Sequence, residues 1–252
     1  MSDLRLTDLL KLLDGAAQRE RRHMDAARLE VLRQYKKVSL KAAAAELRLA
    51  LNSPFPASRD ARLRLTLKAF DIAVKELGLP PAKVESIIRE AVRDRVISVD
   101  QLVRIQDPTL AFNDSAALQA RAVGRARADM NRYWDHETRR FRNDVARVTR
   151  LAIRQNLPPE KAAQLLQDRL GVSRSRAVLI VTDQVRSAAA VADRTRQLAL
   201  GITTYLWRTQ EDNRVRPLHR AKDGQRYVWA DGGERPGDAI LCRCRALPIV
   251  RV

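Results

Sequence analysis

The chain has 252 residues, of which 45% are hydrophobic, so it can hold one large or two modest domains and is not disordered by composition. Its 48 Lys and Arg against 30 Asp and Glu give a formal charge of +18, which attracts polyanions such as nucleic acid. No signal peptide and no run of about eighteen apolar residues is found, so we expect no membrane partner. Two Cys residues fit a reducing cytosol better than a disulfide scaffold.

Residues 1–110 are predicted to form a basic helical N-terminal region. We expect a short helix over 4–13, interrupted by Gly15, and a long helix over 16–51. The apolar positions of the long helix are spaced by three and four residues: Ala27, Val31, Tyr35, Val38, Ala42, Ala45 and Leu49. Such a stripe needs a partner helix, in the same chain or in a second copy.

Prolines and a capping pattern divide the rest of this region. Pro54 and Pro56 end the long helix, and a second helix is expected over 58–77. Pro80 and Pro81 precede a third helix. The pair Ser98 and Gln101 has the spacing of a capping box, which predicts a separate short helix over 98–105.

Residues 111–202 are predicted to contain long helices that lead into the C-terminal part. A helix over 115–156 would bury Trp134 and Phe141 in its core stripe, with base stacking on exposed rings as the alternative. A short helix is expected over 159–171, ended by Gly171, and another over 173–200, ended by Gly201. The inner face of the last helix is predicted to consist of Ala177, Val181, Gln184, Ala188, Val191, Thr195 and Leu198.

The periodicity changes to strand-like alternation in residues 203–252. Strands are predicted over 204–209, 225–229 and 239–250, with turns at Asp223-Gly224 and at 231–233 and a helical turn over 217–222. The whole sequence therefore predicts a mainly α fold. Long amphipathic helices form a helical bundle, and a small β-rich α+β module follows at the C-terminus.

The last segment also carries an ordered set of motifs. Trp207-Arg208-Thr209 reads W-x-T, and residues 212–219 read D-x-R-V-R-P-x-H, with Arg214, Arg216 and His219. Asp223-Gly224, Pro236-Gly237 and C-R-C-x-A-x-P over residues 242–248 follow, with Trp229 in the second predicted strand. These motifs resemble the C-terminal domain of the phage Mu F-like minor head protein family, also called the phage head morphogenesis family. The resemblance covers roughly residues 170–250.

Two cysteines and one histidine in this segment are candidate metal ligands. Cys242 and Cys244 are two residues apart on a predicted strand, so they share a face, and His219 with Asp212 or Asp223 would complete four zinc ligands. The C-x-C spacing differs from the C-x2-C of zinc fingers, and reduced thiols packed in a core are the alternative. We therefore expect no cofactor, with a zinc site at His219, Cys242, Cys244 and Asp212 as the alternative.

Other interpretations of the polar residues stay open. Asp212 is suited to an Asx-turn. Arg214 and Arg216 are candidates for ion pairs with Asp212 or Asp223, with anion binding as the alternative. For His219, a hydrogen bond within its own loop is the alternative to a ligand role. No Ser-centred elbow, Walker loop, HExxH or GxGxxG motif is present, so no enzyme is expected.

The resemblance implies a phage minor head protein that acts as a structural adaptor. It implies a virion protein at the portal vertex, present in the host cytoplasm during assembly, with portal, capsid or scaffold proteins as partners. The basic helices predict non-specific contact with DNA phosphates. A homo-oligomer is a further alternative. The alternative function is a metal-dependent nuclease or toxin-like effector, with the C-terminal module as the active domain.

Overall fold

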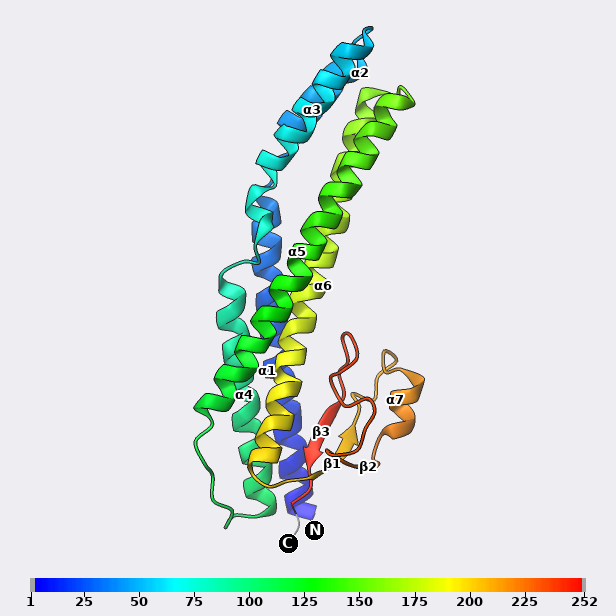
Figure 1. Cartoon of the computed structure of the whole chain (residues 1–252). Coiled ribbons are helices and arrows are strands. Elements are labelled where there is room, and N and C mark those ends of the chain that lie inside the picture. Colours follow the sequence, from blue (N-terminus) through cyan, green and yellow to red (C-terminus); the bar gives the residue numbers. More distant parts are fainter. Residues whose placement is uncertain (1–2, 251–252) are drawn as a thin grey trace. The chain divides into compact units, whose positions relative to one another are not determined.

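A computed structural model describes residues 3–250, which form a mainly helical chain with a small sheet near the C-terminus (Figure 1). The helices in these residues are α1 (Asp3–Lys36), α2 (Lys41–Leu51), α3 (Pro56–Ala73), the 3-10 helix η1 (Lys75–Gly78), α4 (Lys83–Gln106), α5 (Ala116–Arg154), α6 (Pro159–Ala199) and α7 (Pro217–Lys222). The strands are β1 (Thr204–Arg208), β2 (Arg226–Val228) and β3 (Arg245–Pro248). The predicted fold class is confirmed. None of the helices in residues 3–250 combines the length and apolar composition that a membrane span requires.

Two glycines that were predicted to end helices lie inside them. Gly15 is within α1 and Gly171 is within α6, and neither adopts the left-handed conformation that a C-terminal cap requires. An interior glycine costs a helix only about 1 kcal/mol relative to alanine, which packing can offset. Gly201 does adopt φ 74° directly after α6, so this predicted stop is confirmed.

Two predicted helix boundaries in the N-terminal region are wrong. Ser98 lies in the middle of α4, where its hydroxyl donates to the carbonyl of Asp94, so it caps no helix. The predicted helix over 16–51 is interrupted after Lys36 and restarts at Lys41. The interruption changes which residues are buried: Ala42, Ala45 and Leu49 of the predicted stripe are exposed, and α2 buries Ala43, Leu47, Ala50 and Leu51 instead.

The chain divides into two compact units, each made of separate segments. Unit 1 comprises residues 1–27, 82–129 and 181–252, and unit 2 comprises residues 28–81 and 130–180. Helices α1, α5 and α6 each contribute residues to both units. The division of the linear sequence into 1–110, 111–202 and 203–252 stays a prediction.

Unit 2 has an apolar core with aromatic contacts. Trp134 and Phe141 are both buried on α5, as expected for core residues, so base stacking on these two rings is excluded. The Trp134 indole donates to the carbonyl of Leu77 at 2.8 Å, and the rings of Phe70 and Phe141 meet edge to face at 5.2 Å. Large apolar side chains from α3 and α5 therefore hold unit 2 together.

The sheet of unit 1 has the strand order β2-β1-β3, and both pairings are antiparallel. Tyr205 and Trp207 of β1 are buried, and the residues between and beside them are partly exposed, which matches the predicted alternation. Strand β3 is shorter than the predicted 239–250 because residues 239–244 form irregular structure. Helix α7, orange in Figure 1, lies beside the strands.

The last turns of α6 join the sheet through polar side chains. The predicted inner positions Thr195 and Leu198 are exposed, whereas Arg196 and Gln197 are buried. Gln197 donates to the carbonyl of Ala246 at 2.9 Å and accepts from the indole of Trp229 at 3.2 Å. Hydrogen bonds, and not only apolar contact, therefore attach this end of α6 to β3 and to the residue after β2.

A buried ion network connects four elements of unit 1. Arg95 of α4 pairs with Glu20 of α1 and, at 3.0 Å, with Asp193 of α6, and Arg245 of β3 donates to Glu20 at 3.2 Å. Burial raises the pKa of the Asp193 carboxyl, whereas for Glu20 the attraction of Arg95, Arg245 and Arg186 outweighs burial and lowers the pKa. The network fixes α1, α4, α6 and β3 relative to one another.

Candidate metal centre

His219 is placed by a short helix that packs on the first strand. Helix α7 begins at Pro217, whose fixed φ suits the first helical position, and His219 follows two residues later and is only 2% exposed. Its ring meets the fully buried Trp207 of β1 edge to face, with centroids 5.4 Å apart. The ammonium of Lys222 lies 4.6 Å from the Trp207 ring centroid.

The two cysteines lie in the irregular segment just before β3, and not on a strand as predicted. Helix α6 holds the residue before them. Leu241 has a left-handed φ of 56°, its N–H donates to Asp183 at 2.7 Å, and its carbonyl accepts from Arg186 at 3.1 Å. These two contacts fix the backbone immediately before Cys242.

A close approach to α6 supports the same segment. Gly237 has φ 94°, and a Cβ atom at this position would lie only 2.2 Å from the Cβ of Ala190. Only glycine fits both the conformation and the contact, which explains the glycine of the Pro236-Gly237 motif in physical terms. Pro236 itself is buried.

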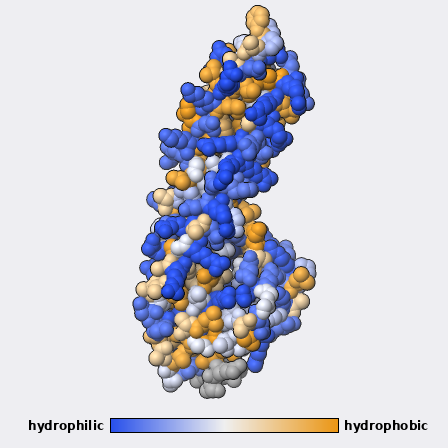
Figure 2. Space-filling model, viewed as in Figure 1, coloured by the Kyte–Doolittle hydropathy of each residue, from blue (hydrophilic) through white to orange (hydrophobic). Residues whose placement is uncertain are grey.

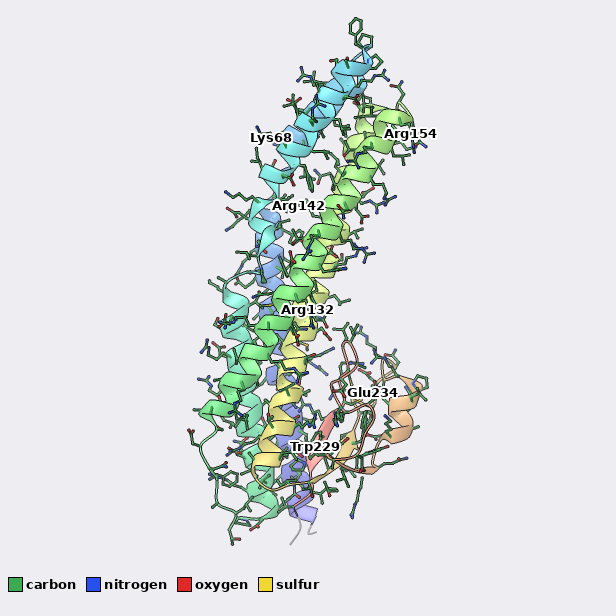
Figure 3. The ribbon with its side chains drawn as sticks, viewed as in Figure 1. Lys68, Arg132, Arg142, Arg154, Trp229 and Glu234 are labelled. Carbon is green, nitrogen blue, oxygen red and sulfur yellow. The ribbon has the colours of Figure 1, made fainter. Side chains whose placement is uncertain are left out.

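The three predicted ligands His219, Cys242 and Cys244 come together in the fold. His219 Nδ1 lies 3.5 Å from Cys242 Sγ and 3.4 Å from Cys244 Sγ, and all three donor atoms lie within 4.8 Å of one another. All three residues are buried. The other ring nitrogen of His219, Nε2, lies 3.0 Å from a carboxylate oxygen of Glu234, which belongs to the loop between β2 and β3 (labelled in Figure 3).

The two thiols differ in their tendency to ionise. A hydrogen bond from Cys244, together with backbone N–H groups and the nearby His219, lowers the pKa of the Cys242 thiol against the opposing effect of burial. The pKa of the Cys244 thiol is raised, because Cys244 donates to Cys242 and is itself buried. The two thiols therefore favour a single negative charge, which lies on Cys242 and accepts the hydrogen bond from Cys244.

The two aspartates lie outside this group of donor atoms. Asp212 accepts from the N–H of Arg214 at 3.0 Å, which is the predicted Asx-turn, and its carboxylate pairs with Arg243. Asp223 accepts from the N–H of Thr209 at 2.7 Å and pairs with Arg208 at 3.3 Å. The two carboxylates thus have ion-pair partners other than the predicted Arg214 and Arg216.

The other motif residues shape the backbone around the site. Gly224 adopts φ 73° and donates to the carbonyl of Trp207 at 2.9 Å. Arg216 donates to the carbonyl of Ile240 at 2.8 Å, and Trp229 is buried against α6 through Gln197. These residues hold the segments that carry the cysteines and the histidine.

Three residues that support the site belong to no motif or periodic pattern of the sequence. Glu234 lies in a Gly- and Pro-containing loop with the composition of a solvated turn, and it is 37% exposed. The apolar periodicity of α6 predicts that Asp183 and Arg186 lie on its solvent-exposed face. Only the three-dimensional contact of each residue shows its role. Glu234 contacts His219, which is 15 residues away in the sequence, and Asp183 and Arg186 both contact Leu241, which is more than 50 residues away.

Comparisons with known proteins agree with the motifs. Residues 143–247 match the family described as Phage Mu protein F like protein, a family of phage head morphogenesis proteins. This confirms the resemblance for the C-terminal part of the chain, and the match begins within α5, upstream of the expected residue 170.

A protein of Haemophilus influenzae, described as uncharacterized, is 32% identical over 106 residues. That match covers 41% of this chain and 24% of the relative, so the chain spans about a quarter of the relative's length. No solved structure matches the chain.

Proposed function

We propose that this chain, whose residues 143–247 match the Phage Mu F-like family, is a structural protein of a phage head that contacts the packaged DNA. The family is one of head morphogenesis proteins, which supports a place in the virion and a structural role over an enzymatic one. Contact with DNA is supported by the distribution of charge. A portal, capsid or scaffold protein as the docking partner rests on the family resemblance.

The positive charge is concentrated in unit 2. This unit has 22 of the 48 Lys and Arg residues and 10 of the 30 Asp and Glu residues, which gives it +12 of the formal charge of +18. Unit 2 makes up only 105 of the 252 residues. Per residue it is therefore nearly three times as positive as unit 1, and a polyanion should bind it first.

Much of this charge forms a continuous stripe on α5. The basic stripe consists of five exposed arginines, spaced by seven, eight, three and four residues: Arg132, Arg139, Arg147, Arg150 and Arg154. These spacings keep all five on one side of a helix. Arg132 and Arg154, labelled in Figure 3, mark its ends, and Figure 2 shows hydrophilic side chains gathered along this part of the surface. The stripe is about 33 Å long, close to one turn of duplex DNA.

The pairing of these arginines leaves them available to phosphates. Arg139 pairs with Asp135, and Arg147 with Asp144, within one turn of the same helix, and the arginines of both pairs are well exposed. Exposed pairs of this kind contribute only about 0–1 kcal/mol, so a phosphate can replace the carboxylate. Arg150 and Arg154 form no ion pair with a carboxylate in residues 3–250. Such contacts bind the backbone of DNA without reading its sequence.

The test is the salt dependence of DNA binding by the full chain. The double variant Arg150→Gln with Arg154→Gln should weaken binding to duplex DNA and reduce the slope of log affinity against log salt by about 2. The matched control, Arg121→Gln with Arg125→Gln, removes the same charge at the same spacing from the unit 1 part of α5. The proposal predicts little change in slope for the control and fails if both variants behave alike.

The structural role has its own test. We expect the full chain to sediment with assembled phage heads that contain its natural portal protein, and to leave DNA intact with added divalent metal. DNA cleavage that is lost in His219→Ala would contradict the structural role and favour a metal-dependent nuclease. Failure to sediment with heads would leave a DNA-binding protein without a head partner.

A further inference from the structure

We propose that His219, Cys242 and Cys244 bind one Zn²⁺ ion, which fastens α7 to the segment before β3. The proposed contact with DNA requires no metal, so this inference goes beyond it. A zinc ion here would be a structural link inside the C-terminal module, defined as residues 203–250, and would connect two segments that are 23 residues apart in sequence.

The distances between the donor atoms fit a tetrahedral zinc site. Zinc binds sulfur at about 2.3 Å and histidine nitrogen at about 2.0–2.1 Å, and a tetrahedral angle between such bonds separates the nitrogen and the sulfur by about 3.6 Å. The structure has 3.5 Å from His219 Nδ1 to Cys242 Sγ and 3.4 Å to Cys244 Sγ. The two nitrogen-to-sulfur distances are therefore already within about 0.2 Å of those that the ion requires. The two sulfurs lie within 4.8 Å of each other, and binding would bring them to about 3.8 Å.

The second nitrogen of the histidine has the partner expected of a metal ligand. A histidine that binds a metal through one nitrogen commonly donates its other N–H to a carboxylate, which fixes the tautomer and orients the ring. Glu234 occupies that place, 3.0 Å from Nε2. In the zinc-bound state Nε2–H would donate to Glu234, and the lone pair of Nδ1 would bind the ion between the two sulfurs.

Trp207 supplies a donor to one of the two sulfurs, and Zn²⁺ takes the place of the thiol protons when it binds. The indole N–H of Trp207 is buried without an oxygen or nitrogen partner in the described part of the chain, and it interacts with the sulfur of Cys244. Two thiolates and a neutral histidine around Zn²⁺ form a site with no net charge, which suits a buried position.

The chain supplies three ligands, because Asp212 and Asp223 are held by Arg243 and Arg208. The fourth tetrahedral position is open to water, so the site would hold its ion with one protein ligand fewer than the four that are usual in structural zinc sites. The energetic reason for the ion is the small size of the module. Its core consists of a few aromatic rings, Ala246 and the two cysteines themselves, and a small core of this kind gains stability from a metal link.

The decisive experiment measures metal in the full chain. Protein expressed with added zinc should contain about one Zn²⁺ per chain by elemental analysis, and replacement by Co²⁺ should produce the visible absorption of a tetrahedral cobalt–thiolate site. Cys244→Ser and His219→Gln should lose most of the metal. The control Asp212→Asn, a nearby carboxylate outside the donor group, should keep it.

A second measurement separates zinc binding from simple packing. Glu234→Gln should still bind zinc, but about 10–100-fold more weakly, because the carboxylate orients the histidine without binding the ion. Removal of zinc by a chelator should lower the Tm of the wild type and leave that of Cys244→Ser unchanged. If Cys244→Ser does not fold, the cobalt spectrum of the wild type alone distinguishes a metal site from two packed thiols.

The proposal is overturned if the wild type contains no zinc and shows no cobalt–thiolate absorption. It is also overturned if Cys244→Ser retains as much metal as the wild type. Either result would leave two packed thiols hydrogen-bonded to His219 and would not affect the DNA-binding test, which concerns unit 2.

Discussion

The two units of the chain use charged side chains in opposite ways. Unit 2 buries apolar and aromatic residues such as Phe70, Trp134 and Phe141 and keeps most of its arginines in solvent. Unit 1 buries charged and polar groups, including Arg95, Asp193, Arg196, His219 and Arg245. Exposed charge attracts any polyanion and demands little of its neighbours, whereas a buried charge must be met by a partner at a defined place. We therefore expect the buried charges of unit 1 to specify one arrangement of its elements, and the exposed charges of unit 2 to supply a general affinity for polyanions.

The strongest test of this contrast is the removal of one buried charge. Glu20→Gln should lower the free energy of unfolding by about 3–5 kcal/mol, because Arg95 and Arg245 would be left buried without their shared carboxylate. The matched change in unit 2 is Asp71→Asn, which breaks a well-exposed pair with Arg142 and should cost less than about 1 kcal/mol. Urea unfolding of both variants gives the two values, and equal losses would remove the contrast.

A smaller loss of stability is expected from a substitution at Gly237, where the C-terminal module packs against α6. Gly237→Ala should cost about 2–4 kcal/mol, because it combines a left-handed backbone with an overlap against Ala190. In the background of Ala190→Gly, which by itself costs α6 about 1 kcal/mol, Gly237→Ala should cost only the part that comes from the backbone, because the overlap is gone. Thermal or urea unfolding measures both, and an unchanged stability in Gly237→Ala would mean that this contact does not hold the segment.

The smallest losses of unfolding free energy are expected when one buried indole is removed from each unit. Trp229→Phe should cost about 1–3 kcal/mol, because it leaves the Gln197 side-chain oxygen buried without its donor. Trp134→Phe should cost about 0.5–1.5 kcal/mol, because the Leu77 carbonyl keeps a weaker contact with Thr138. A larger loss in unit 2 than in unit 1 would contradict the view that polar contacts matter more in unit 1.

Local signals in the sequence were enough for several elements. Pro217 predicts the start of α7 because proline suits the first helical position, and the alternation of residues 204–209 predicts β1. Three of the four candidate zinc ligands do lie together, because the motifs place both cysteines and the histidine in one small module.

Signals that depend on distant partners were missed. A search for apolar periodicity passes over Asp193, Arg196 and Gln197, although all three are buried, because their partners lie on other elements. The same holds for Glu234, whose role depends on a histidine in α7. Gly15 and Gly171 do not end helices as predicted, because a glycine within a long helix costs only about 1 kcal/mol relative to alanine.

Chemical modification of arginines tests directly whether DNA contacts unit 2 and not the C-terminal module. Phenylglyoxal modifies accessible arginines, and mass spectrometry measures the modification of each one with and without duplex DNA. We predict protection of Arg147, Arg150 and Arg154, and unchanged modification of the exposed arginines Arg214, Arg216 and Arg220 of the module. Protection of the module arginines, with none along the basic stripe, would contradict the account.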